Sequence, residues 1–446
     1  MSAFPSAGAA AVGRWLTVTL RIDGGLFRHA SVLLVATLLG QALSFLIQVV
    51  LARRIGIESY GLYAYAISWV SFLSMLALMG SDRVLVRYLP EYGSSRQHGL
   101  FRGVLAWMAG TGLAVSVTAG LGFYALRRYL HPPSSAEEAG ALAWAATILP
   151  LMVVAGVTEN ALRGCGAHAV ATWPSRVLRP VFFILLILAP LGVTEDARWA
   201  LALNGLAILL AFLPTLRALW ARLPPRAGAG VPLPVRLWLT TSVVIGVNSV
   251  ALYLNSQIDM LVLGFVGDQT ALGTYGALTR IVTVVSLASS AVITIVQPMI
   301  ATARAEGRDL GPLVRGGARM VFLASAGAGL VTFAAAPELL SLFGERFATG
   351  ATALRILSLG WTTSSLLSLA GPLLLMTGHE RNASAIMVQG ALLNLVLNLL
   401  LTPRFGIDGA ATATALSAVA WNVALFLVAR ARVGVAALPV RLPAGG

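Results

Sequence analysis

The sequence contains few charged residues and a single cysteine. Charged residues make up 11% of its 446 residues, whereas about a quarter is usual for a soluble domain. The one cysteine, Cys165, excludes an internal disulfide and a cysteine-based metal cluster. Lysine is absent, so the net charge of +14 comes from arginines, and these are scattered through short segments instead of forming one basic face. Composition therefore argues against a soluble domain and against a nucleic-acid-binding protein.

The motifs of common enzyme classes are absent as well. The sequence has no phosphate-binding P-loop, no Gly-x-Ser-x-Gly motif and no assembled group of Ser, His and Asp. Its five histidines show no metal-ligand spacing, and no segment between the apolar runs is long enough for a catalytic domain. We therefore expect no enzymatic activity and no cofactor, apart from H⁺ or Na⁺ as a coupling ion.

Apolar residues dominate what is present. They make up 58% of the chain, and the mean hydropathy is +0.84. They form runs of roughly 20 residues, long enough for a helix to cross about 30 Å of hydrocarbon. In lipid such runs must be helical, because every backbone polar group needs an internal partner. The predicted fold is an all-α integral membrane protein with about twelve transmembrane helices. The expected spans lie near residues 30–52, 61–80, 103–126, 140–162, 177–193, 199–220, 237–264, 273–300, 316–343, 352–377, 383–402 and 409–429.

The arginines are distributed unevenly between alternate connecting segments. One set of segments holds about three times as many arginines as the other, which places that set on the cytoplasmic side. Both termini are then cytoplasmic, and we expect a multi-pass protein of the bacterial inner membrane. The predicted organisation is a cytoplasmic tail (1–28), an N-lobe of six helices (29–220), a Pro/Gly-rich cytoplasmic linker (221–236), a C-lobe of six helices (237–432) and a second cytoplasmic tail (433–446).

A short internal repeat supports two equivalent lobes. Gly61-Leu-Tyr63 follows the first predicted span, and Gly273-Thr-Tyr275 follows the seventh. Two sets of six spans enter the membrane from the same side, so we expect the lobes to be related by an axis along the membrane normal.

Polar side chains recur on one face of the first span and of the seventh. Alignment of the repeat pairs Gln48 with Asp259 and Ser44 with Asn255. A polar face is costly against lipid, so both faces are expected to lie against protein or a water-filled cavity. Hydrogen bonds between packed helices remain one interpretation, and the match between the lobes favours the other, a shared central cavity. The predicted substrate-binding residues of these faces are Asn248, Asn255, Gln41 and Gln48.

Two charged residues, Asp259 and Arg280, lie inside predicted spans. Isolated in hydrocarbon, each would cost roughly 3 kcal/mol or more. They lie on either side of the same predicted loop, so we expect them to pair or to share the cavity. A static salt bridge between two helices is one interpretation. In the other, Arg280 is a substrate-binding residue that contacts a ligand phosphate, and Asp259 has a coupling or gating role.

Three charged residues near span ends are weaker candidates. Glu159 is a second candidate for coupling or gating, although its position beside Arg163 is more typical of a solvated helix end. Arg53 and Arg54 are expected to extend to lipid headgroups, and a role at the mouth of the cavity is the alternative.

Four segments resemble the Wzx-like polysaccharide flippases of the multidrug/oligosaccharidyl-lipid/polysaccharide (MOP) superfamily. Together with the twelve predicted spans, the resemblance covers almost the whole chain, and it implies a V-shaped pair of six-helix lobes around a cavity. It also implies export of an undecaprenyl-diphosphate-linked oligosaccharide for surface polysaccharide biosynthesis, such as lipopolysaccharide or exopolysaccharide. The segments are Leu51–Ala64, Met79–Tyr92, Gln257–Gly264 with Gly273–Tyr275, and Asn394–Asn398 with Thr402–Ala413.

The partners that this resemblance implies are a lipid-linked oligosaccharide, membrane lipids, a polysaccharide polymerase and glycosyltransferases, with no nucleic acid. Three other functions are alternatives. A MATE-like, cation-coupled multidrug antiporter favours acidic over basic residues in the cavity, and here one internal acid is matched by one internal base. A lipid II flippase of the same superfamily often carries two extra helices. A polytopic glycosyltransferase or polymerase needs a large periplasmic loop, which this sequence lacks.

Overall fold

The computed structural model describes residues 24–78, 80–130, 132–133, 135–189, 196–225, 232–266 and 268–439. Within these ranges the chain forms helices joined by short turns and no strand. The prediction of an all-α protein is confirmed.

The first half of the chain contains eight helical elements. They are α2 (Gly24–Leu78), α3 (Ser81–Ser94), α4 (His98–Leu130), α5 (Ala136–Gly164), α6 (His168–Trp173), the π-helix η1 (Pro174–Leu178), α7 (Arg179–Leu188) and α8 (Ala197–Trp220).

The second half contains another eight. They are α9 (Val235–Val266), α10 (Gln269–Ala305), α11 (Leu310–Ala334), α12 (Ala336–Ser341), the 3₁₀ helix η2 (Glu345–Gly350), α13 (Ala351–Ser365), α14 (Ala370–Met376) and α15 (Glu380–Val433).

The described helices account for the expected number of membrane crossings. Seven of them are long and apolar enough to span a membrane, or eight if the bent pair around α13 and α14 forms one span. The first and last of these are each divided by a glycine with a non-helical backbone, Gly56 (φ 78°) in α2 and Gly406 (φ 57°) in α15. Dividing both at these glycines and adding α9 and α10 gives twelve segments. Glycine adopts a positive φ without steric cost, so each turn needs a single residue.

Some predicted boundaries were wrong. Residues expected to connect the first two spans and the last two spans are helical except at the two glycines. The fifth segment begins at His168 instead of 177, because Pro174 is accommodated in the π-helical turn η1. The expected span 316–343 ends at Ala334, and the expected span 352–377 is bent by 42° between α13 and α14.

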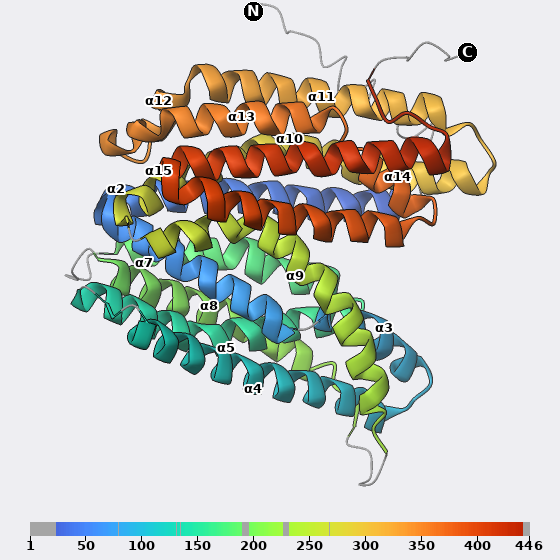
Figure 1. The fold of residues 1–446 in the computed structure, drawn as a ribbon. Coiled ribbons are helices and arrows are strands. Elements are labelled where there is room, and N and C mark those ends of the chain that lie inside the picture. Colours follow the sequence, from blue (N-terminus) through green and yellow to red (C-terminus); the bar gives the residue numbers. More distant parts are fainter. Residues whose placement is uncertain are drawn as a thin grey trace, which may run out of the picture.

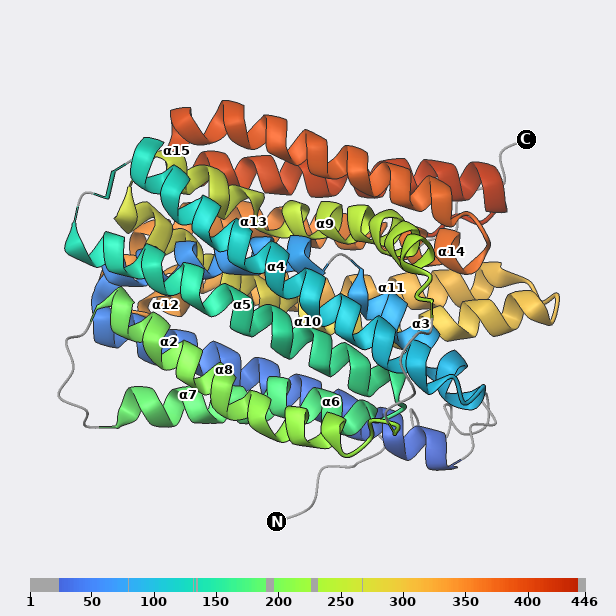
Figure 2. The ribbon, with the colours of Figure 1, turned by 90° about the horizontal axis from the view of Figure 1, so that it is seen from below.

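The helices form two groups that meet at one end of the molecule (Figure 1). One group contains α4, α5, α7 and α8, with α2 as its inner helix, and the other contains α10, α11, α13 and α15; α9 lies between them (Figures 1 and 2). We call the end with Gly56, the α9–α10 turn and Gly406 the converging end. The opposite end, with α3 and the first turns of α9 and α11, is the diverging end.

The backbones of α2 and α10 touch at the converging end. A Cβ atom on Gly61 would lie 2.2 Å from the carbonyl oxygen of Gln269, and one on Gly273 would lie 2.1 Å from the carbonyl oxygen of Ile57. No side chain fits at either position, so the two glycines permit a direct helix-to-helix contact. These are the glycines of the internal repeat, and the repeat therefore forms the contact between the two groups.

Side chains next to these glycines also hold the two groups together at the converging end, and we call these contacts and the glycine contact the seal. Tyr60 is fully buried, and its ring packs against Phe343 and Phe347, with centroid distances of 6.3 and 5.9 Å. Arg53 donates from Nε to the carbonyl oxygen of Leu342 at 2.6 Å, and Arg346 forms an ion pair with Glu58 at 3.1 Å. Residues of α2 are thus bonded to the α12–η2 segment of the other group.

At the diverging end, α9 is anchored in the first group. Trp238 is completely buried, and its Nε1 donates to the hydroxyl of Tyr92 on α3 at 3.1 Å. The other end of α9 contributes Met260 and Leu263 to the large buried cluster at the converging end. Helix α9 therefore links both groups along its length.

We predict that Gly273→Val separates α2 from α10, because the added side chain meets the Ile57 carbonyl group. Spin labels at exposed Tyr129 of α4 and Phe405 of α15, introduced as cysteines in a Cys165→Ser background, should report a longer mean distance by double electron–electron resonance. Gly110→Val is the matched control, since a Cβ there has no neighbour within 4 Å, and it should leave the distance unchanged. Equal distances in the parent and in Gly273→Val would show that the glycine contact does not hold this end together.

Candidate functional site

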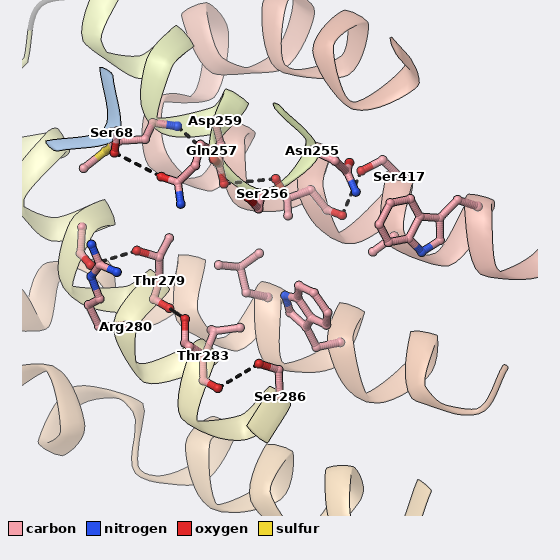
Figure 3. Close-up of a pocket in the computed structure, with 18 residues that line it drawn as sticks. Ser68, Asn255, Ser256, Gln257, Asp259, Thr279, Arg280, Thr283, Ser286 and Ser417 are labelled. Atoms are coloured by element: carbon pink, nitrogen blue, oxygen red, sulfur yellow. Dashed lines mark hydrogen bonds between the residues drawn. The ribbon is translucent and has the colours of Figure 1, made fainter. Parts of the chain in front are cut away.

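A polar cavity of about 280 Å³ lies among α9, α10, α13 and α15, with Ser68 of α2 at its edge. Figure 3 shows its polar residues in two facing rows, one on α9 and one on α10. The α9 row carries Asp259 and the α10 row carries Arg280. The lining residues are Ser68, Asn255, Ser256, Gln257, Asp259, Met260, Gly276, Thr279, Arg280, Val282, Thr283, Ser286, Leu357, Trp361, Thr414, Ser417, Ala418 and Trp421.

Arg280 is the cationic residue of this cavity. It lies eleven residues after Gln269, the first residue of α10, which is about 16 Å along the helix. Its Nε is buried and has no hydrogen-bond partner among the described residues, and the described acids form no ion pair with it. The guanidinium group lies beside the phenol of Tyr60. Arg280 thus brings a positive charge without a carboxylate partner to the wall of the cavity.

Asp259 lies at the same cavity and has different partners. Its side chain is 4% exposed and accepts hydrogen bonds from the hydroxyl of Tyr275, from the hydroxyl of Thr414 at 3.3 Å, and from the backbone N–H of Met260 at 2.9 Å. Asp259 and Arg280 therefore share the cavity without an ion pair in the described structure. Three donors stabilise the carboxylate where desolvation would otherwise be costly.

Asn255 belongs to a hydrogen-bonded ladder that joins α9 to α15. Asn394 donates to the backbone and side-chain oxygens of Asn255 at 3.1 and 3.2 Å, Asn398 donates to Asn394 at 2.8 Å, and Thr402 donates to Asn398 at 3.1 Å. Asn394, Asn398 and Thr402 are each 0% exposed. The ladder fixes the cavity wall, and its buried amides satisfy one another.

The other predicted site residues lie at varied distances from this cavity. Gln48 accepts a hydrogen bond from the Tyr60 hydroxyl at 3.0 Å, so Tyr60 connects it to Arg280. Gln41 is partly buried two turns earlier on α2. The side chain of Asn248 lies outside the described residues. Glu159 forms an ion pair with Arg163 near the end of α5 and does not line the cavity, so the structure does not bring it together with Asp259.

The expectation that Arg53 and Arg54 extend to lipid headgroups stays a prediction, and the structure gives both exposed side chains a partner within the protein. Arg53 donates to the carbonyl oxygen of Leu342, and Arg54 donates from Nη1 to the carbonyl oxygen of Ile187 at 2.7 Å. Carbonyl groups near helix ends lack intrahelical partners, so the arginines at the converging end can donate hydrogen bonds to them.

A third intramembrane charge, Arg179, was not predicted from the sequence. The structure places it in the middle of the segment from His168 to Leu188. Its Nη2 donates to the Asn204 side chain at 3.2 Å, and Asn204 donates to the Tyr63 hydroxyl at 3.2 Å. Its expected position was the cytoplasmic start of a span at 177. An earlier start at His168 would have placed it eleven residues inside.

The described lining of the cavity offers hydroxyl and amide groups, one cation, and one carboxylate that already accepts three hydrogen bonds within the protein. No group of three or more His, Cys, Asp or Glu residues suited to a metal ion occurs in the described part of the chain. The arrangement suits reversible binding of a polar, anionic ligand better than covalent chemistry.

Solved structures with the same fold are transporters of the MOP superfamily. The lipid II flippase MurJ in an inward closed conformation has a TM-score of 0.73 at 13% identity, with 89% of this chain and 87% of MurJ covered. An inward-facing multidrug resistance MATE transporter has a TM-score of 0.70 at 16% identity, covering 88% and 94%. An outward-facing MATE transporter has a TM-score of 0.61 at 16% identity, covering 90% and 94%. The predicted fold class of two-lobed MOP transporters is confirmed.

Similarity in sequence assigns the chain to one family within this fold class. The model of the polysaccharide biosynthesis protein family matches residues 26–303, and the chain belongs to this family. Its members and structural neighbours are transporters and flippases, not enzymes, which confirms the predicted resemblance. A curated relative, the probable low-salt glycan biosynthesis flippase Agl15 of Haloferax volcanii, is 28% identical over 176 residues, or 38% of this chain. The match spans 37% of that flippase, a little over a third of its length.

The asparagine ladder gives a stability prediction. Asn394→Ala removes the donor to Asn255 and leaves buried oxygens without a partner, so the free energy of unfolding should fall by about 1–2 kcal/mol. Unfolding of the purified protein in mixed micelles with increasing SDS measures this loss. Val396→Ala on the same helix, where the side chain is 51% exposed, should change the value by less than about 0.5 kcal/mol. Equal effects of the two substitutions would contradict a stabilising ladder.

Proposed function

We propose that this protein is a flippase that moves an undecaprenyl-diphosphate-linked oligosaccharide from the cytoplasmic to the periplasmic leaflet of the bacterial inner membrane for surface polysaccharide biosynthesis. The observation that carries the proposal is Arg280, a cation without an ion-pair partner at the wall of an internal polar cavity. A guanidinium group binds phosphate oxygens through charge-assisted hydrogen bonds. Membership of the polysaccharide biosynthesis family supports an oligosaccharide as the group attached to the phosphate.

The cavity lies in a molecule whose helices converge at one end and diverge at the other, as alternating access requires. With both termini in the cytoplasm, as the arginine distribution predicts, the diverging end faces the cytoplasm. The higher TM-score against the inward-facing MATE transporter supports this assignment. The headgroup then enters from the cytoplasmic side and leaves when the glycine contact at the converging end opens.

Coupling to an ion is assigned to Asp259. Among the described residues that line the cavity it is the one acid, and a proton or a Na⁺ ion that binds its carboxylate competes with the bonds from Tyr275 and Thr414. Because these residues lie on α10 and α15, such binding changes the contacts among three helices around the cavity. Glycosyltransferases that build the oligosaccharide and a polymerase that extends it are the partners expected on either side of this step.

A cation-coupled multidrug antiporter is the second candidate, and the buried carboxylate of Asp259 is the observation that favours it. The charges at the cavity argue for the first candidate. Asp259 already accepts three hydrogen bonds, whereas the Nε of Arg280 has no partner among the described residues. The charge without an ion-pair partner among the described residues is therefore the positive one, and it attracts an anion.

We predict that Arg280→Ala weakens binding of undecaprenyl diphosphate by about 10- to 100-fold, the value of one or more hydrogen bonds to a charged group. Native mass spectrometry or thermophoresis of the protein in nanodiscs measures the dissociation constant. Arg280→Lys should retain part of the affinity, because it keeps the charge and loses the planar donor geometry. Arg319→Ala, at an exposed position of α11, is the control. Unchanged affinity in Arg280→Ala would remove the basis of the proposal.

Asp259→Asn tests the coupling assignment. The wild-type protein in liposomes should flip a lipid-linked oligosaccharide faster when a H⁺ or Na⁺ gradient is imposed. The variant cannot change its charge, so it should lose the acceleration and keep its affinity for the lipid. Glu306→Gln, at the exposed end of α10, serves as the control. A gradient response in Asp259→Asn equal to that of the wild type would make Asp259 a structural residue.

A further inference from the structure

A second cavity, of about 220 Å³, lies beside the first within the second group of helices. Seven of its fifteen lining residues are serines, and we call it the serine cavity. Ser286, Trp361 and Trp421 line both cavities, so the two meet at these three residues. None of the lining residues is charged.

The serine cavity lies where a helix is broken. Ser365 ends α13, and α14 begins at Ala370 after a bend of 42°. Ser365, Ser368 and Pro372 from this region line the cavity. Discontinuous helices within a membrane are tolerated where their backbone lies against protein or lines a cavity, and in transporters they often mark substrate sites.

The described residues of the serine cavity have more free hydrogen-bond acceptors than free donors. Five of its serine hydroxyls donate to backbone carbonyl groups of their own or a neighbouring helix, and Ser289 and Ser325 bond to each other. Most donors are therefore committed, while hydroxyl oxygens retain lone pairs that can accept. Two donors are left over among the described residues: the Nε1–H of Trp421, which is buried and has no partner, and one hydroxyl of the Ser289–Ser325 pair, because the bond between them uses a single hydrogen.

This inventory selects the chemistry of a ligand. An occupant must supply several donors to the serine oxygens and at least one acceptor to the Trp421 N–H group. A bare cation supplies no acceptor, and the described residues that line the cavity include no carboxylate to balance its charge. An anion would meet a wall made largely of acceptors. A neutral polyol supplies both donors and acceptors, and the two indole rings offer flat apolar surfaces to the C–H faces of a sugar ring.

The spacing between the cavities suits a phosphate-linked sugar. Ser286, at the junction, lies six residues after Arg280 on α10, which is about 9 Å along the helix. A diphosphate held at Arg280 therefore places the sugar bonded to it near the shared residues Trp361 and Trp421.

We infer that the serine cavity is the binding subsite for the sugar attached to the lipid diphosphate, with Trp421 donating to a sugar oxygen and Trp361 packing on the ring. This inference rests on the proposed function and extends it. Arg280 recognises the diphosphate common to all such lipids, and the serine cavity recognises the saccharide.

The test compares lipids with and without a sugar. Undecaprenyl diphosphate alone, and the same lipid carrying glucose, galactose or N-acetylglucosamine, are bound to the protein in nanodiscs. The wild type should bind at least one sugar-bearing lipid about tenfold more tightly than the bare lipid. Trp421→Phe keeps an aromatic side chain, although a smaller one, and removes the N–H group, so it should lower that preference about fivefold, as for one hydrogen bond. Because Trp421 also lines the first cavity, the readout is the ratio of the affinities for sugar-bearing and bare lipid, and not the affinity for the bare lipid alone.

Trp361→Leu should lower the same preference about tenfold through loss of the aromatic surface, again measured as a ratio of affinities because Trp361 lines both cavities. Trp144→Phe is the matched control, because Trp144 lies on α5 with 40% of its surface exposed. The serine cavity is not a sugar site if the wild type shows no preference for any sugar-bearing lipid, or if Trp421→Phe lowers the affinity for all lipids equally. If the wild type binds none of the lipids, including the bare diphosphate, the proposed function itself fails.

Discussion

The direct contact between the backbones of α2 and α10 determines the arrangement of this molecule. Gly61 and Gly273 come from the two copies of one sequence repeat, and each leaves no room for a Cβ atom against the other helix. The two groups of helices are therefore closest at this point and diverge from it. Tyr60, one residue before Gly61, is held by this contact between the α12–η2 segment and Arg280. The seal and the cationic wall of the cavity thus share a side chain.

The same geometry suggests how the seal is released. Movement of one group against the other must separate the glycines, the ring of Tyr60 from Phe343 and Phe347, and Arg53 from the Leu342 carbonyl. An exposed ion pair such as Glu58–Arg346 contributes about 0–1 kcal/mol, so packing provides most of the resistance. Helix α9 is anchored at one end by the buried side chain of Trp238 and at the other by that of Leu263. It must therefore bend or slide during this motion. A ligand that binds between α9 and α10 acts on both.

Much of the fold follows from local sequence signals. Apolar runs of roughly 20 residues specify membrane helices by length alone, and Asp259 and Arg280 stand out because charge is costly in such runs. Their shared cavity followed from their positions around one turn. Arg179 was not predicted to lie in the membrane, because its depth depends on a π-helical turn at Pro174. No hydrophobic periodicity in the sequence predicts such a turn. The partners of Asn255 and the junction formed by Trp361 and Trp421 depend on contacts between distant helices, and single-helix patterns carry no information about them.

The central claim is that this protein moves a lipid-linked oligosaccharide between leaflets. The most direct measurement uses purified wild-type protein in liposomes that contain undecaprenyl diphosphate bearing a short oligosaccharide. A membrane-impermeant glycosidase added outside removes the sugars of the outer leaflet, and the remaining protected fraction is followed over time. A flippase in the membrane should make the protected fraction fall to near zero, whereas protein-free liposomes should keep about half. A protected fraction that stays equal with and without protein, together with export of a cationic dye by the same liposomes, would contradict the flippase and favour the multidrug antiporter.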